Sequence, residues 1–242
     1  MDLIRLEQIT KNYGNPGSDI TTHVLKGVTF SIQEGEFLSI MGPSGSGKST
    51  LMHIIGLLDR PTSGKYFLRG EDTSQLSDDQ LARLRNKEIG FIFQSFNLLP
   101  RISVLENVVL PLSYVGLSQA KEEELALKVI RAVGMEHRIN NMPNQLSGGE
   151  QQRVAIARAF VNNPSIIFAD EPTGNLDSKS GQQVMSILQE LNHQGHTVVL
   201  VTHESATAEH GTRMIKIHDG KILSDEPIIN RLLADREGEL GK

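Results

Sequence analysis

The sequence lacks cysteine and long apolar runs, and each absence excludes a class of protein. With no cysteine among its 242 residues, the chain cannot build a disulfide framework, so a reducing, cytosolic setting is the natural one. No uninterrupted apolar run approaches the roughly 18 residues that a membrane-spanning helix needs. The first residues include Asp2 and Glu7, where a secretory signal would have a basic start and an apolar stretch. We therefore expect a soluble protein that can still attach to a membrane partner.

A large charge of one sign is also absent. The chain has 24 Lys and Arg residues against 29 Asp and Glu residues, which gives a formal net charge of −5. Nucleic-acid-binding domains usually carry a basic face, so this balance argues against general nucleic-acid binding. The length permits one large α/β domain or a domain with a subdomain. We find no internal repeat, coiled-coil heptad pattern or low-complexity linker.

A glycine-rich stretch at residues 42–50 fits the phosphate-loop pattern of a Gly, four free positions and then Gly-Lys-Ser. An apolar strand is expected before it at residues 37–41, and Leu51, Ile54, Ile55 and Leu58 follow at helical spacing. A glycine-rich turn that binds nothing is the alternative, and this strand–loop–helix context argues against it. The residues predicted to bind the triphosphate are Gly42, Pro43, Ser44, Gly45, Ser46, Gly47, Lys48, Ser49 and Thr50. Lys48 would reach the β- and γ-phosphates, and the Ser49 hydroxyl would ligate Mg²⁺.

Alternating strands are expected on both sides of this loop. Residues 3–10 and 28–32 alternate apolar and polar side chains, and residues 66–68 end at Arg69-Gly70 like the edge of a hairpin. We expect an antiparallel β portion beside the nucleotide. Tyr13, which precedes a turn-rich insertion at residues 14–19, could stack on a base or be a plain strand-end aromatic.

Polar side chains follow three solidly apolar segments that are typical of buried parallel strands. Gln94 follows the segment 89–93, Asp170 and Glu171 follow the segment 166–169, and His203 follows the segment 197–202. Parallel sheets bind ligands beyond the carboxyl ends of their strands. Asp170 is therefore predicted to hold Mg²⁺, and Glu171 to orient or deprotonate the attacking water, unless it only starts a helix. At this edge His203 would hold the γ-phosphate.

Residues 95–159 change to helical periods and predict a mostly helical subdomain inserted into the α/β core. Its last helix opens at residues 146–150, where Ser147 and Glu150 form a capping box around two glycines. Glycine costs a helix about 1 kcal/mol relative to alanine. The pair is either a helix start that needs a tight turn or a second anion site. A second anion site would require a second nucleotide, supplied by a head-to-tail pair of chains.

Three expectations concern the rest of the chain. Asp177 is predicted to cap a helix. Residues 214–223 predict a hairpin that turns at Asp219-Gly220. The charged tail, residues 225–242, is predicted to be a solvated helix with one apolar patch.

Together these motifs resemble an ABC-transporter ATP-binding subunit over residues 3–223. They are residues 42–49, Gln94, the signature Leu146, Ser147, Gly148, Gly149 and Glu150, residues 166–171, Leu176 with Asp177, and His203. Phosphate-loop kinases and GTPases share the first motif but not the signature. Residues 56–61, 96–100 and 172–177 resemble the branch that serves lipoprotein release, macrolide-type export and cell-division complexes. Gly174-Asn175 replaces the Ser-Ala of many other transporters, which argues against an import complex.

The resemblance implies an α/β phosphate-loop (RecA-like) NTPase core with an N-terminal antiparallel β subdomain and an inserted helical subdomain, forming one cassette over residues 1–224. ATP and Mg²⁺ would be clamped between the phosphate loop of one subunit and the signature of a second subunit, which is expected to be identical. Tyr13 would stack on adenine, Gln94 would touch Mg²⁺ and sense the γ-phosphate, and Asp177 would communicate across the dimer.

The resemblance also implies a separate membrane permease. It would dock near residues 94–112 and hold the chain at the inner face of the cell membrane. The apolar side chains of Phe96, Leu98 and Leu99 fit either docking or burial.

Two other functions remain open at this stage. A soluble ABC-class ATPase acting on DNA or ribosomes is disfavoured, because residues 95–145 are too short for a long coiled coil and only one cassette is present. A complex that gates signalling or a cell-wall hydrolase would have the same cassette. The sequence does not identify the cargo or the membrane partner.

Overall fold

The computed structural model describes residues 2–14 and 21–234. These residues form two compact units. Of the described residues, the first unit comprises those up to Arg85 together with Thr197–Leu232, and the second comprises Asn86–His196 together with residues 233–234. Most of the predicted insertion after Tyr13 and the tail beyond residue 234 lie outside the described residues. Each unit is described below by itself.

The first unit contains the predicted antiparallel sheet. Its strands are β1 (Asp2–Gly14), β2 (Thr21–Gln33), β4 (Ser63–Leu68) and β5 (Glu71–Asp72), in the order β2-β1-β4-β5. Alternate apolar side chains of β1 and β2 are buried, as the sequence pattern predicts. Arg69 and Gly70 both have positive φ, 50° and 81°, which suits the two-residue turn between β4 and β5.

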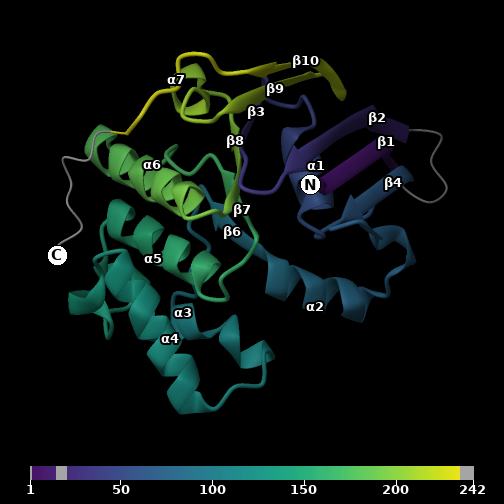
Figure 1. The fold of residues 1–242 in the computed structure, drawn as a ribbon. Helices are drawn as coiled ribbons and strands as arrows, with labels where there is room; N and C mark the ends of the chain where they lie inside the picture. The colour runs from purple at the N-terminus through teal and green to yellow at the C-terminus, as the bar shows by residue number, and fades with distance from the viewer. Residues whose placement is uncertain (1, 15–20, 235–242) are drawn as a thin grey trace. The chain divides into compact units, whose positions relative to one another are not determined.

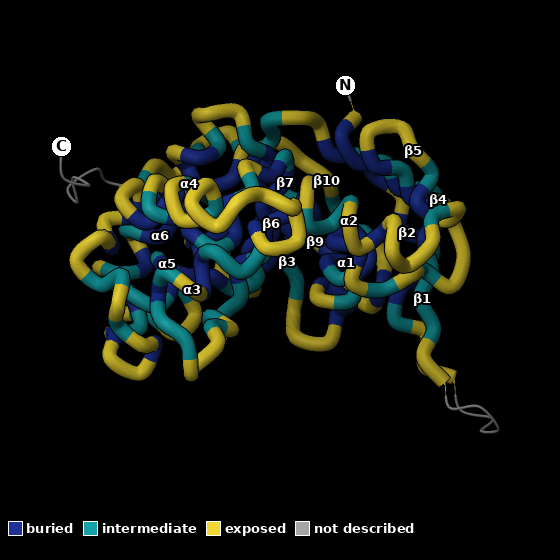
Figure 2. Tube along the Cα trace, turned by 90° about the horizontal axis from the view of Figure 1, so that it is seen from below, coloured by how far each residue is buried: buried dark blue, intermediate teal, exposed yellow. Residues whose placement is uncertain are grey.

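A second sheet in this unit carries the glycine-rich loop. β3 (Phe37–Met41) pairs in parallel with β8 (Thr197–Thr202) and with β9 (Arg213–His218), and β10 (Lys221–Pro227) pairs antiparallel with β9. β8 is buried throughout, and β3 is buried except at Met41. Figure 2 colours the trace by burial, with buried residues in dark blue. The predicted hairpin is confirmed, with Asp219 and Gly220 at φ 48° and 76°. The short helix α7 (Ser205–Ala208) follows β8.

Helix α1 (Lys48–Ile55) follows β3 and is shorter than the periodicity predicts. Gly56 caps its end by donating to the carbonyl of Met52, and Leu57 then adopts a positive φ of 57°. Leu58 therefore lies outside the helix and is exposed, which corrects its predicted place in the helical stripe. The turn η1 (Thr73–Gln75) and helix α2 (Asp78–Glu88) were not predicted, because α2 has only a weak apolar stripe.

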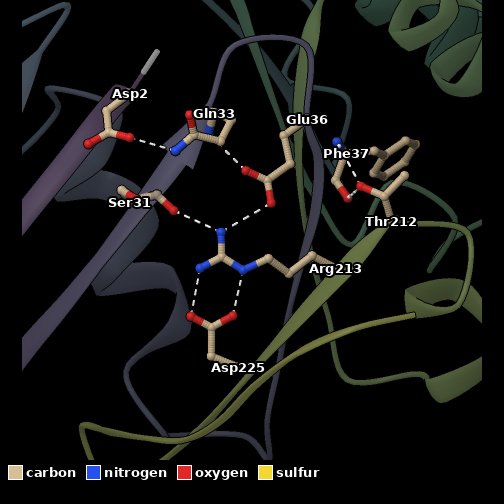
Figure 3. A network of polar contacts seen from close by, with 8 residues as sticks. All are labelled: Asp2, Ser31, Gln33, Glu36, Phe37, Thr212, Arg213 and Asp225. Carbon is tan, nitrogen blue, oxygen red and sulfur yellow. Dashed lines mark hydrogen bonds and ion pairs between the residues drawn. The ribbon is translucent and has the colours of Figure 1, made fainter. Parts of the chain in front are cut away.

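Figure 3 shows how Arg213 of β9 joins the two sheets of the first unit. Its guanidinium binds both carboxylate oxygens of Asp225 on β10, with Nε–Oδ1 at 2.5 Å and Nη2–Oδ2 at 2.6 Å. Its Nη1 donates to the carbonyl of Ser31 on β2 at 2.9 Å and to Glu36 Oε1 at 3.1 Å. Glu36 Oε2 in turn accepts from the backbone of Gln33 at 2.7 Å. A single side chain thus holds β2, β9, β10 and the start of β3 together.

The second unit is built on two parallel strands and a set of helices (Figure 1). β6 (Ile89–Phe93) pairs with β7 (Ile166–Asp170), and the rings of Phe91 and Phe168 stack with centroids 5.6 Å apart. Helix α5 (Gly148–Phe160) packs on β6 so closely that a Cβ on Gly90 would lie 2.3 Å from the Ala159 carbonyl oxygen. The other helical segments are α3 (Val104–Val109), η2 (Leu112–Tyr114), α4 (Gln119–Ala132), η3 (Glu136–Arg138), η4 (Pro143–Gln145) and α6 (Ser178–His193). The helical character predicted for residues 95–159 is therefore confirmed.

The prediction of a helix from Asp225 onward is wrong over the described residues. Asp225–Pro227 belong to β10, and residues 228–234 are not helical. The physical reason is pairing: Asp225 is held by Arg213, and the chain beyond continues along the first unit through the bonds Ile228 N to Thr212 O and Leu232 N to Glu209 O, both 2.9 Å. Ile229 and Leu233 are exposed.

Candidate functional site: a phosphate loop and three adjoining loops

The phosphate loop leaves the carboxyl end of β3, as predicted. Met41 lies opposite Thr202 in the parallel β3–β8 pair, so residues 42–50 and His203 leave the same edge of the sheet. Gly45 and Gly47 have φ of 77° and 101°, a conformation that favours glycine. α1 begins at Lys48, directly after Gly47. The backbone N–H groups of the first helical turn are therefore available to an anion.

Three features of the loop fit a polyphosphate. A Cβ on Gly42 would lie 2.2 Å from the Ile217 carbonyl oxygen, so only glycine lets the loop pass here. The Ser46 hydroxyl is buried and has no hydrogen-bond partner among the described residues. The Nζ of the buried Lys48 donates to the loop carbonyls of Gly42 and Pro43, at 2.8 and 2.9 Å. A cationic side chain and an unpaired hydroxyl inside a glycine-lined loop suit the phosphates of ATP.

Tyr13, at the end of β1, is 44% exposed. Its hydroxyl donates to Asp59 Oδ2 at 2.9 Å, and Lys11 Nζ donates to Asp59 Oδ1 at 2.6 Å. Burial and the bond to Asp59 raise the pKa of the Tyr13 phenol. Burial opposes ionisation of Asp59, but the bonds from Lys11 and Tyr13 outweigh it and lower the pKa of that carboxyl. The ring is thus fixed at its hydroxyl end and open to solvent, which suits either alternative for Tyr13.

In the second unit, Gln94 and Asp170-Glu171 leave the carboxyl ends of neighbouring strands. Phe93 lies opposite Asp170 in the β6–β7 pair. Glu171 has a positive φ of 44°, a strained conformation for this residue. The loop that follows folds back on the Gln94 turn, because Asn175 Nδ2 donates to the Gln94 carbonyl at 3.0 Å. Gln94 therefore leaves the same sheet edge as Asp170 and Glu171 in the second unit. His203 leaves the same edge as the phosphate loop in the first unit.

The signature stretch forms the predicted capping box at the start of α5. Glu150 N donates to Ser147 Oγ at 3.3 Å, and Ser147 N donates to Glu150 Oε2 at 2.8 Å. The bond from the Ser147 backbone lowers the pKa of Glu150 most, with help from Arg138, whose Nε lies 3.1 Å from Glu150 Oε1. Leu146, directly before Ser147, is buried.

The two glycines of the signature differ. A Cβ on Gly149 would lie 2.6 Å from Ser180 Oγ, so packing against α6 requires glycine there. A Cβ on Gly148 would meet only ordinary contacts at 3.5–3.7 Å. Packing therefore explains glycine at position 149 and does not require it at position 148.

Asp177 caps α6, as predicted. Its carboxylate accepts from the backbone N and the hydroxyl of Ser180, at 3.0 and 2.7 Å, and these bonds lower the pKa of Asp177. In the segment predicted to dock a partner, Leu99 is 45% exposed, whereas Phe96 and Leu98 are half-buried. Burial therefore accounts for only part of that apolar stretch, and docking stays a prediction.

The sequence analysis missed the side chains that hold these loops. Arg158 of α5 donates to the carbonyls of Asn97 and Phe96, at 2.5 and 2.9 Å, and burial lowers its pKa. Gln152, fully buried, donates to the Pro172 carbonyl at 2.7 Å. Asn107, also fully buried, bonds the backbone of residues 99–103. A polar residue on the otherwise apolar face of a helix was the available signal for all three.

The described part of the chain contains no helix long and apolar enough to cross a bilayer. It also holds no group of three or more His, Asp or Glu side chains placed to bind a metal ion.

Comparison with known proteins identifies the family. The family model described as "ABC transporter" matches residues 25–174. A macrolide export ATP-binding/permease protein of Brucella melitensis is 52% identical over 223 residues, which are 92% of this chain and 34% of that protein. An uncharacterized ABC transporter ATP-binding protein of Thermotoga maritima is 50% identical over 204 residues, 84% of this chain and 87% of the other. The chain thus spans about a third of the macrolide-export relatives that it matches.

Solved structures agree. The chain resembles the ATP-binding cassette MJ0796, solved as a dimer in a post-hydrolysis state with ADP and phosphate, at a TM-score of 0.85 and 46% identity over 93% of this chain and 98% of that one. The fold and the loop define a phosphate-loop nucleotide-binding protein of mixed α/β architecture. The matches to the family model and to the relatives are specific. The chain belongs to the ABC transporter family and is an ATP-binding cassette with that family's ATPase domain.

Proposed function

We propose that the chain binds and hydrolyses ATP as the motor of an export or lipoprotein-release complex. The observation that carries this is the phosphate loop, in which the buried Lys48 and the unpaired Ser46 hydroxyl lie in a turn that only glycine allows. The relatives named for macrolide export support the branch. A complex that transmits force across the membrane without carrying cargo would use the same cassette.

The proposed roles divide between loops. Residues 42–50 bind the triphosphate, with Lys48 on the phosphates and Tyr13 against the base. Ser49, Gln94 and Asp170 would hold Mg²⁺, which neutralises phosphate charge when bound. Hydroxyl, amide and carboxylate oxygens are the donors that this hard cation prefers. Glu171 orients or deprotonates the attacking water, and His203 stabilises the γ-phosphate.

The active form is proposed to be a head-to-tail dimer, in which residues 146–150 of one chain cap the nucleotide held by the other. The glycine at position 148, which packing does not require, supports this assignment, as does the dimeric state of the MJ0796 structure. Asp177 would relay the state of one site to the other. A separate permease would bind near residues 94–112, keep the chain at the inner face of the membrane and turn dimer closure into movement.

Glu171→Gln tests the scheme. The change keeps the size of the side chain and removes its capacity as a base, so ATP should still bind while turnover falls by about a hundredfold or more. The uncleaved nucleotide should then accumulate a dimer, measured by light scattering after size-exclusion chromatography with ATP. Lys48→Ala is the control that should remain monomeric, because it loses nucleotide binding.

Two results would contradict the scheme. One is a Glu171→Gln protein that stays monomeric with saturating ATP. The other is a Lys48→Ala protein that hydrolyses ATP at the normal rate. Co-purification with ribosomes or DNA and with no membrane protein would instead favour a soluble ATPase.

A further inference from the structure

The Gln94 turn is a strained segment that its neighbours hold in place. Phe96 and Asn97 both have positive φ, 60° and 51°. This region is costly for a bulky residue such as Phe96. Such strain persists only where the surroundings fix the chain. Two hydrogen bonds from Arg158 to the carbonyls of Phe96 and Asn97 hold the end of the turn.

Gly174 and Asn175 contact Gln94, at the start of the turn. Asn175 Nδ2 donates to the Gln94 carbonyl at 3.0 Å. The side chain of Gln94 lies across Gly174, where a Cβ would be 2.6 Å from Gln94 Nε2 and 3.2 Å from its Cδ. The backbone of Gly174 is not in the left-handed region, so this position is glycine for space and not for conformation. One residue thus makes room for the Gln94 side chain, and the next fixes its backbone.

These contacts tie the loop after β6 to the loop after β7. Gly174 N donates to the Glu171 carbonyl at 3.0 Å, so Gly174 is also fixed relative to the strained Glu171. Residues 171–175 are therefore connected to Gln94 by direct contacts. All of these contacts lie within the second unit.

We infer that Gly174 and Asn175 are positioning residues for Gln94, setting its side chain for the metal–nucleotide complex. This inference rests on the proposed function, in which Gln94 is a metal ligand. A branched or larger residue at position 174 would turn the Gln94 amide away. Removing the donor at position 175 would release the Gln94 carbonyl and let the strained turn relax.

Gly174→Ala separates positioning from stability. The atom that the new methyl group meets is the far end of a flexible side chain, so Gln94 rotates away and the fold is kept. Partners that orient metal ligands are worth about tenfold or more in metal affinity. We expect the gain in affinity for a fluorescent trinitrophenyl-ATP on adding Mg²⁺ to fall about tenfold, and the affinity measured in EDTA to stay unchanged.

Asn175→Asp, which replaces the amide donor by an acceptor of the same size, should reduce the Mg²⁺-dependent gain in the same way. It also serves as the test if Gly174→Ala does not fold. Gly181→Ala is the matched control, because its Cβ would meet only Thr173 carbons at 3.6 Å and should leave the gain intact.

A double-mutant cycle with Gln94→Ala decides the mechanism. If Gly174 acts through Gln94, Gly174→Ala causes no further loss in the Gln94→Ala protein. The inference is overturned if Gly174→Ala keeps the normal gain, if the two losses add, or if Gln94→Ala itself has no effect. Failure of the proposed function is seen separately, as a parent protein that does not bind the nucleotide analogue even with Mg²⁺.

Discussion

Replacing Arg213 by alanine should cost the first unit about 3 kcal/mol of unfolding free energy. The guanidinium makes four polar contacts, two of them to Asp225 and one each to Glu36 and the Ser31 carbonyl (Figure 3). Hydrogen bonds to charged groups contribute about 1.5–3 kcal/mol each when buried. A simple sum would be too large, because the Arg213 side chain is 24% exposed and that of Asp225 34%. The Glu36 side chain is only 11% exposed, so leaving it without its partner is the largest contribution to the loss. The expected fall in unfolding free energy is therefore about 2–4 kcal/mol.

The measurement is urea or thermal unfolding followed by circular dichroism. For a protein of this size, about 3 kcal/mol corresponds to a fall in Tm of roughly 6–12 °C. Arg131→Ala is the matched control, since Arg131 pairs with Glu136 at 2.8 Å on an exposed surface and should cost less than about 1 kcal/mol. Arg213→Lys should fall between the two, because lysine keeps the charge but not the two-pronged bond. A loss for Arg213→Ala no larger than that for Arg131→Ala would refute the view that Arg213 joins the two sheets.

Two further predictions concern the second unit. Glu150→Gln should cost about 1 kcal/mol at neutral pH. A carboxylate with a lowered folded pKa contributes stability above its ordinary pKa and loses it as the pH falls through the folded value. The difference from the parent protein in urea unfolding should therefore vanish on acidification, and a pH-independent difference would contradict this origin. Asn107→Ala should cost about 3 kcal/mol in the same assay, because it leaves the Leu99 N–H and the carbonyls of Leu99 and Ile102 in a partly buried site without their partner, and limited proteolysis should cut first within residues 95–103.

The sequence predicts the buried strands well, because their apolar runs are continuous and end in polar residues. β6, β7 and β8 lie within a residue of their predicted bounds, and the capping residues Ser147 and Asp177 start their helices as expected. Prediction fails where tertiary contacts decide. Asp225–Pro227 pair as part of a strand, and Asp225 is held there by Arg213, a contact 12 residues apart that no local pattern encodes. Helix α2 is not predicted from the sequence, because its apolar stripe is weak.

The site can likewise be predicted where a local pattern encodes it and not where tertiary contacts decide. A phosphate loop is encoded locally, since glycines at fixed spacing produce the left-handed turns at Gly45 and Gly47 that the loop needs. The support of a loop is not local. Gly174 and Asn175 are, from the sequence, only markers of a branch, and it takes the folded chain to show that one clears space for the Gln94 side chain and the other holds its carbonyl. In this chain the two residues therefore have separate mechanical roles, because a larger residue at position 174 could not coexist with this placement of Gln94, whereas the side chain of Asn175 bonds the Gln94 backbone.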